Sequence, residues 1–156
     1  WYANKTIQSL IRHWKYNYVR EAEPVIERLL IQWFNVSQQL PTDDWSVASI
    51  PLHSIRLRQR GFNQAEVLTR MVAEELGVPS AILLRRTKHH IKPQADLETS
   101  QRSKREMSFA ATHRPPKAIL LVDDVYTSGR TMQLAAAELK RAGAAKVWGV
   151  VLARGD

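Results

Sequence analysis

Residues 119–131 read Ile-Leu-Leu-Val-Asp-Asp-Val-Tyr-Thr-Ser-Gly-Arg-Thr, and this stretch decides the fold. Its first four residues, Ile119 to Val122, are apolar and predict a short buried strand. Two carboxylates, Asp123 and Asp124, follow the strand, and a turn of hydroxyls and glycine then opens a helix. Backbone N–H groups at a helix start bind phosphate, whereas paired acids suit sugar hydroxyls or a Mg²⁺ ion. The stretch therefore predicts one place for the phosphate and the ribose of a single ligand.

This order of strand, two acids and Thr/Ser-Gly-x-Thr loop resembles the motif with which type I phosphoribosyltransferases bind phosphoribosyl pyrophosphate (PRPP). The resemblance implies that the two acids hold the ribose hydroxyls and are the catalytic residues, and that the loop holds the 5′-phosphate. Arg130 stands where the family commonly has a small residue, so it either adds charge to the phosphate clamp or points to solvent. The implied ribose and phosphate site comprises Asp123, Asp124, Val125, Tyr126, Thr127, Ser128, Gly129, Arg130 and Thr131.

Three other kinds of structure also carry acids after an apolar strand. In the receiver domain of a response regulator nearly a whole domain follows the acids, whereas only residues 125–156 remain here. A Walker B strand needs an upstream G-x-x-x-x-G-K-[ST] loop, which this sequence lacks. An ordinary strand with a solvated polar end explains the acids but not the loop behind them. The phosphoribosyl interpretation is therefore preferred.

Length and composition are those of one globular domain. The chain has 156 residues, of which 44% are hydrophobic and 24% charged, enough to bury a core without metal or disulfide support. No apolar run approaches the roughly eighteen residues of a membrane-spanning helix, so no membrane insertion is expected. The absence of cysteine fits a cytoplasmic protein.

The net charge of +8 predicts an anionic partner or substrate. The basic residues gather in three clusters, each of which alone is also typical of a solvated charged face. These clusters are Arg56, Arg58 and Arg60; Arg85, Arg86, Lys88 and Lys92; and Arg102, Lys104 and Arg105.

Strands and helices are expected to alternate along residues 45–156, which predicts an α/β fold with a mainly parallel sheet flanked by helices. Residues 1–44 are expected to form an amino-terminal helical segment packed on this phosphoribosyltransferase-like domain. Residues 87–113 are polar and aperiodic, which is typical of a lid or a disordered excursion. The expected strands are 47–50, 81–84, 117–122 and 147–152, and the expected helices are 7–14, one from Glu23, one after Asn63 and 131–142.

Residues 51–65, Pro-Leu-His-Ser-Ile-Arg-Leu-Arg-Gln-Arg-Gly-Phe-Asn-Gln-Ala, resemble the signature of the ComF family. These phosphoribosyltransferase-like proteins are associated with natural competence. The resemblance implies a pyrophosphate loop, a hood that closes over the site, and Mg²⁺ bound with PRPP. Members usually carry an amino-terminal zinc segment with four cysteines, and because this chain has none, zinc is not expected. The implied pyrophosphate loop is Pro51, Leu52, His53 and Ser54, extending to Arg56 and Arg60, and the implied hood residues are Lys104 and Arg105.

The predicted function is PRPP binding by a phosphoribosyltransferase-like protein that takes part in the uptake and processing of transforming DNA. It either transfers the phosphoribosyl group to an unidentified acceptor, or serves the DNA-uptake machinery as a non-catalytic nucleotide sensor or single-stranded DNA-binding adaptor. The acid pair argues against a pure DNA clamp because it repels a DNA backbone. The basic excess argues for partners beyond one small substrate, so single-stranded DNA and competence proteins are expected as well.

Overall fold

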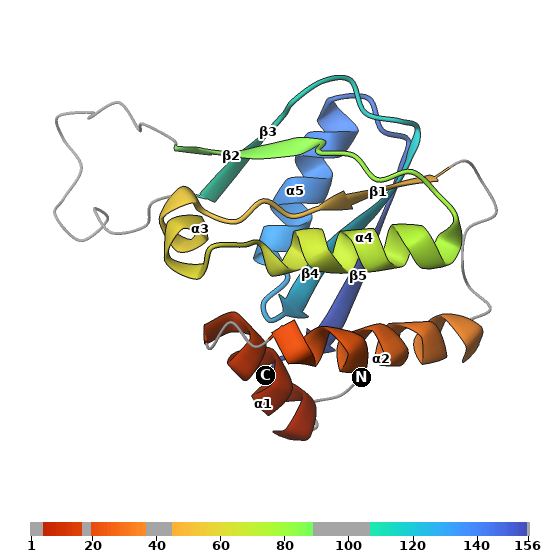
Figure 1. The fold of residues 1–156 in the computed structure, drawn as a ribbon. Coiled ribbons are helices and arrows are strands. Elements are labelled where there is room, and N and C mark those ends of the chain that lie inside the picture. Colours follow the sequence, from red (N-terminus) through yellow and green to blue (C-terminus); the bar gives the residue numbers. More distant parts are fainter. Residues whose placement is uncertain (1–4, 17–19, 37–44, 89–106, 156) are drawn as a thin grey trace, which may run out of the picture.

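The computed structural model describes residues 5–16, 20–36, 45–88 and 107–155. It contains helices on both sides of a small parallel sheet, together with a separate antiparallel strand pair (Figure 1). The elements in chain order are α1 (Lys5–Tyr16), the 3-10 turn η1 (Arg20–Ala22), α2 (Glu23–Val36), β1 (Trp45–Ser49), α3 (Ser54–Arg60), α4 (Gln64–Leu76), β2 (Leu84–Lys88), β3 (Met107–Ala111), β4 (Ala118–Tyr126), α5 (Arg130–Arg141) and β5 (Lys146–Arg154).

The central sheet has the order β1-β4-β5, and all of its neighbours are parallel. Val47 adds an isolated parallel bridge to Ser80 on the outer side of β1. A parallel sheet is commonly covered on both faces, and Ile119 and Leu120, which lie on opposite faces of β4, are accordingly both buried. The predicted α/β fold with a mainly parallel sheet flanked by helices is confirmed.

Two hydrophobic cores lie on the two faces of this sheet. One core joins the sheet to α1, α2 and α4, and includes the fully buried Trp14, Ile26 and Val72. The other joins it to α5 and to the β2–β3 pair, and includes Leu84, Phe109 and Leu139. The helices of the amino-terminal segment thus share a core with the sheet. The division of the chain at residue 44 into a segment and a domain stays a prediction.

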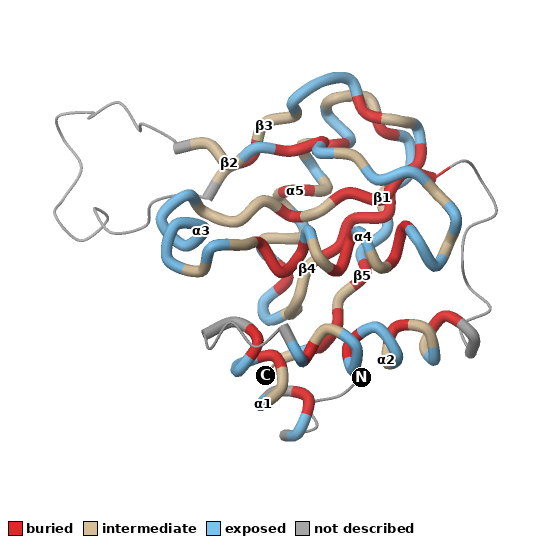
Figure 2. Tube along the Cα trace, viewed as in Figure 1, coloured by how far each residue is buried: buried red, intermediate tan, exposed pale blue. Residues whose placement is uncertain are grey.

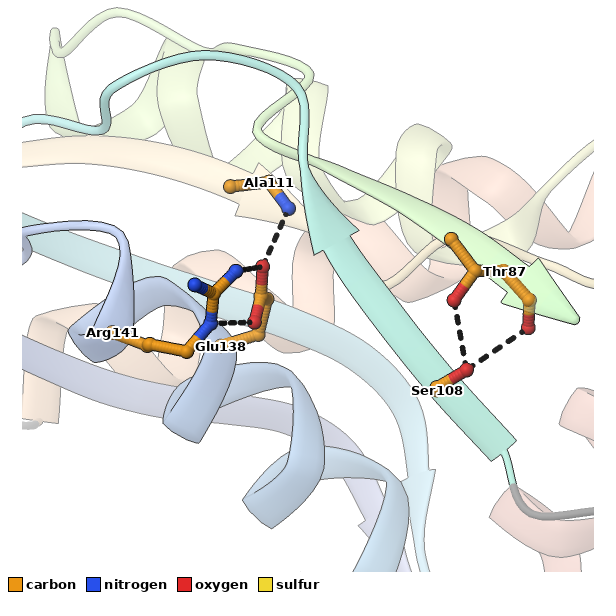
Figure 3. A network of polar contacts seen from close by, with 5 residues as sticks. All are labelled: Thr87, Ser108, Ala111, Glu138 and Arg141. Carbon is orange, nitrogen blue, oxygen red and sulfur yellow. Dashed lines mark hydrogen bonds and ion pairs between the residues drawn. The ribbon is translucent and has the colours of Figure 1, made fainter. Parts of the chain in front are cut away.

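A polar network fastens the β2–β3 pair to α5 (Figure 3). Glu138 of α5 accepts a hydrogen bond from the Ala111 backbone N–H at 2.9 Å and two from the Arg141 guanidinium at 2.7 Å each. Arg141, and then the Ala111 N–H, lower the pKa of the Glu138 carboxyl because both stabilise its charged form. Across the strand pair, the Ser108 hydroxyl bonds to the Thr87 hydroxyl at 2.8 Å. The Ala111 end of the strand pair is therefore joined to α5, and the Thr87–Ser108 bond joins the two strands to each other near the other end.

The stretch from Pro51 to Arg60, predicted as a loop, is irregular only at its start, because residues from Ser54 onward form the helix α3. The His53 side chain accepts a hydrogen bond from the Ile55 N–H at the start of this helix, and Gly61 ends it with a left-handed φ of 75°. None of its residues is buried, as Figure 2 shows in pale blue. A helix of seven residues without an apolar face has no periodic signal in the sequence.

Strand boundaries also differ from those predicted. β4 runs on through Asp123 and Asp124 to Tyr126, because its parallel pairing with β5 continues as far as Tyr126 and Arg154. The two acids therefore lie within the strand and not after it. β2 begins at Leu84, where residues 81–84 were predicted to form a strand. β3 lies within the stretch 87–113, which was predicted to be irregular, because pairing with β2 makes residues 107–111 extended.

None of the helices in the described ranges has the length and apolar character needed to cross a bilayer.

Candidate functional site

The carboxyl end of β4 and the start of α5 form the first half of the site. Gly129 takes a left-handed φ of 73° at the start of α5 and has no side chain to cap the helix. Gly129 therefore caps none of the N–H groups in the first turn of α5. Helix starts that bind anions need such uncapped N–H groups. A cavity of about 20 Å³ opens here, lined by Asp123, Val125, Tyr126, Thr127, Gly129, Thr131, Met132 and Val151.

The structure brings most of the predicted ribose and phosphate residues together at this cavity. Asp123 is half-buried, and its side chain accepts a hydrogen bond from the Asp124 backbone N–H at 2.9 Å. Asp124 is also half-buried but is not among the lining residues. Of the two acids, only Asp123 therefore lines this cavity. Ser128 and Arg130 are exposed outside the cavity.

The predicted pyrophosphate loop lines a second, larger cavity of about 290 Å³. Pro51, Leu52, His53 and Ser54 form one wall, and residues 84–87 of β2 form another. His53 accepts through its Nδ1 atom from the Ile55 N–H at 3.2 Å, so in the neutral ring the proton lies on Nε2 and remains available to donate. The histidine thus both begins α3 and carries a donor beside the cavity.

The two arginines predicted to extend this loop are not in the cavity wall. Arg56 is exposed on α3. Arg60 donates a hydrogen bond to the side chain of Gln64 at 3.3 Å, within the stretch that joins α3 to α4. The hood residues Lys104 and Arg105 lie outside the described residues.

Arg86 is a further residue of the larger cavity that the sequence-based site did not include. It lies in the wall of the larger cavity, half-buried on β2, with its guanidinium 5.6 Å from the centre of the Phe109 ring. Burial lowers the pKa of Arg86 from its ordinary value; the positive charge of Arg56 acts in the same direction and the negative charge of Asp123 opposes both. The charge of Arg86 therefore interacts with a positive charge on α3 and a negative charge on β4.

One sequence signal pointed toward Arg86. It belongs to the second basic cluster, and in a strand adjacent side chains face opposite ways. Arg85 is accordingly exposed and Arg86 is half-buried beside Phe109, although both line the same cavity. The sequence alone does not show which of Arg85 and Arg86 faces inward, because that depends on where β2 lies relative to the central sheet.

The arrangement suits an extended anion with a sugar at its centre. The helix start of α5 offers backbone donors for one phosphate, Asp123 offers acceptors for hydroxyls, and Arg86 with the His53 loop offers positive charge and donors for a second anionic group. Within the described residues, no group of three His, Asp or Glu side chains gathers as a metal site would require.

Comparison with known proteins identifies the family. The phosphoribosyl transferase domain family matches residues 63–156, which is more than half of the chain. The chain belongs to this family. The matched part holds the acid pair, the glycine loop and Arg86, whereas the Pro51 to Ser54 loop precedes it.

Two curated relatives agree with the resemblance to the ComF family, which is thereby confirmed. Competence protein F of Haemophilus influenzae is 29% identical over 115 residues, covering 69% of this chain and 50% of that protein. DNA utilization protein YhgH of Salmonella typhi is 30% identical over 148 residues, covering 88% of this chain and 63% of that protein. The chain thus spans less than two thirds of the length of either relative.

Solved structures of phosphoribosyltransferases share the fold. Glutamine PRPP amidotransferase from B. subtilis, solved with ADP and GMP, matches with a TM-score of 0.53 at 18% identity, over 84% of this chain and 26% of that one. Hypoxanthine phosphoribosyltransferase from Staphylococcus aureus matches with a TM-score of 0.51 at 10% identity, over 83% and 62% of the two chains. The predicted type I phosphoribosyltransferase-like fold is confirmed.

Proposed function

We propose that this chain binds PRPP across the carboxyl end of its sheet and acts in the handling of DNA during uptake. The observation that carries the proposal is that Asp123 shares a cavity with the Thr127 to Thr131 loop, while Arg86 lines a second cavity together with the Pro51 to Ser54 loop. Membership of the phosphoribosyl transferase domain family supports the ligand. The names of the relatives, a competence protein and a DNA utilization protein, support the biological setting.

In this proposal each part of the ligand meets a different part of the chain. The first turn of α5 receives the 5′-phosphate because its N–H groups and dipole favour an anion. Asp123 and Asp124 accept hydrogen bonds from the ribose hydroxyls. The Pro51 to Ser54 loop and Arg86 receive the pyrophosphate, which carries most of the negative charge.

The same arrangement supports phosphoribosyl transfer. Breaking the bond between the anomeric carbon and pyrophosphate leaves positive charge on the ribose and negative charge on the leaving group, so donors and cations at the leaving group lower the barrier. Arg86 and the N–H of His53 are positioned to act in this way. Mg²⁺ prefers oxygen ligands, which the acid pair and the phosphates of PRPP offer together, and when bound it would neutralise part of the pyrophosphate charge.

The deciding experiment is calorimetric titration of PRPP with Mg²⁺ into the wild type and the Asp123→Asn/Asp124→Asn variant. Asparagine keeps an oxygen that can accept the Asp124 N–H bond, so the fold is retained while the charged acceptors are lost. Hydrogen bonds to charged groups contribute about 1.5–3 kcal/mol each, so the affinity is expected to fall by ~100-fold or more.

A matched control is Glu74→Gln/Glu75→Gln. These two acids are also adjacent, lie exposed on α4, and change the net charge by the same amount. The control is expected to bind PRPP as the wild type does. Unchanged affinity in a folded Asp123/Asp124 variant, or an equal loss in the control, would show that the acid pair does not hold the ribose.

A further inference from the structure

Asn63 uses its whole side-chain amide to join two separate parts of the fold. The residue is 4% exposed at the start of α4. Its Oδ1 accepts a hydrogen bond from the Ala65 N–H at 3.2 Å, which caps the helix. Its Nδ2 donates to the Ile50 carbonyl at 3.1 Å and to the Glu66 carboxylate at 3.2 Å. Both amide hydrogens and the oxygen therefore have partners inside the protein.

The bond from Asn63 to Ile50 joins the two ends of the segment 51–62, which leaves the central sheet after β1. Residues 51–62 leave the sheet after Ile50, form the Pro51 to Ser54 loop and α3, and return at Asn63. Ile50 is itself 4% exposed, and its N–H donates to the Val122 carbonyl of β4 at 2.9 Å. Ile50 is thus held on one side by the acid-bearing strand and on the other by α4.

We infer that Asn63 is a positioning residue for the pyrophosphate half of the ligand, an inference that rests on the proposed function. Pro51 follows Ile50 directly, so the direction in which the loop leaves the sheet is set by the peptide group that Asn63 holds. Leaving-group donors act only when held within a fraction of an ångström of the productive geometry. Asn63 also lines the larger cavity, but its polar atoms are already bonded inside the protein, so we infer that it acts through Ile50.

The phosphate loop at the start of α5 is held by contacts that do not involve Asn63. The Gly155 N–H donates to the Tyr126 carbonyl at 2.8 Å, and the Gln133 N–H donates to the Gly129 carbonyl at 2.9 Å. Loss of the Asn63 bond is therefore expected to disturb the pyrophosphate half and to spare the half that binds ribose and 5′-phosphate. A residue that merely stabilises the fold would affect both halves alike.

The test uses two substitutions that keep the helix cap. Asn63→Ser retains a hydroxyl that can accept the Ala65 N–H, because serine is among the best capping residues, but its short side chain does not reach Ile50. Asn63→Thr likewise retains a capping hydroxyl that does not reach Ile50, and it adds no charge beside Glu66. The control is Val72→Ala, which removes two buried methyl groups from the same helix away from the loop and so reports on destabilisation alone.

Calorimetry measures the Kd of PRPP, pyrophosphate and ribose 5-phosphate, each with Mg²⁺, for the wild type and the three variants. In the Asn63 variants the Kd of PRPP and of pyrophosphate is expected to rise about tenfold, while that of ribose 5-phosphate changes less than about twofold. The ratio of the PRPP and ribose 5-phosphate constants is expected to stay at the wild-type value in Val72→Ala.

Each other outcome overturns a definite statement. Equal changes for PRPP and ribose 5-phosphate in both Asn63 variants, or no change for either, would overturn the positioning role while the proposed function stands. A wild-type protein that binds none of the three ligands would overturn the proposed function, and this inference with it.

Discussion

Gly129 lies between the strand that carries the acids and the helix that follows, and its φ of 73° is left-handed. In Gly129→Ala the new side chain must adopt this conformation, which costs about 1–2 kcal/mol. A Cβ at this position would also overlap the Tyr126 hydroxyl and ring, with the ring carbon Cε2 2.9 Å away. Tyr126 must then move from beside Arg154, whose guanidinium lies 5.8 Å from its ring centre. The total expected loss of stability is about 2–4 kcal/mol.

Gly77→Ala is the matched control for this substitution. Gly77 ends α4 with a φ of 64°, so alanine meets the same backbone strain, but no atom lies within 4 Å of the added Cβ. It is expected to cost about 1–2 kcal/mol only. The difference between the two variants therefore isolates the overlap with Tyr126.

Thermal unfolding followed by tryptophan fluorescence measures both effects. A loss of 1 kcal/mol lowers Tm by about 2–4 °C in a chain of this size, so Gly129→Ala is expected to lower it by about 4–16 °C. In a Tyr126→Ala background the overlap is absent, and Gly129→Ala should then cost no more than Gly77→Ala does. PRPP affinity should fall in Gly129→Ala and not in Gly77→Ala, since only Gly129 lies in the phosphate loop. Equal Tm values for the two glycine variants would refute the reasoning from crowding.

Arg86→Ala is expected to weaken PRPP binding by about tenfold or more in a calorimetric titration, whereas Arg85→Ala, which removes the exposed neighbour, should change it by less than about threefold; equal losses would contradict the inward role of Arg86. Glu138→Gln should lower stability in urea at neutral pH, and this difference from the wild type should shrink in acid. The pKa of Glu138 in the folded protein lies below its usual value of 4.5, so its contribution to stability is complete above pH 4.5 and is lost as the pH falls through the folded pKa. A stability difference between Glu138→Gln and the wild type that does not change with pH would contradict the network with Arg141. Ile26→Ala removes a fully buried side chain of α2 and should cost about 2–5 kcal/mol in one cooperative transition, whereas two separate transitions would show that the amino-terminal helices do not share the core of the sheet.

Much of the fold was predictable because its signals are local. The apolar run before the acids, the Asn63 start and Gly77 end of α4, and the glycine at the start of α5 each follow from the preferences of neighbouring residues. Residues 51–54 line a cavity because they follow the end of β1, and their role as a pyrophosphate loop stays a prediction.

Errors arose where pairing between distant residues decided the conformation. β4 extends through the acids because β5 continues beside it, and β2 and β3 are strands because they pair with each other across residues 89–106. α3 escaped prediction because its start depends on a histidine cap and none of its residues is buried. Arg56 and Arg60 were assigned to the loop by their motif, although neither lines the cavity.

The kind of site, a strand followed by two acids and a glycine loop, could be predicted because it depends on spacing along a few consecutive residues. The side chains that complete the site depend on how the elements pack. The charge of Arg86 interacts with that of Asp123, and Asn63 donates a hydrogen bond to Ile50. Both interactions form because the fold brings together elements that lie well apart in the chain. Contacts of this kind depend on how faces pack, and packing is a property of the whole fold that no single stretch of sequence carries.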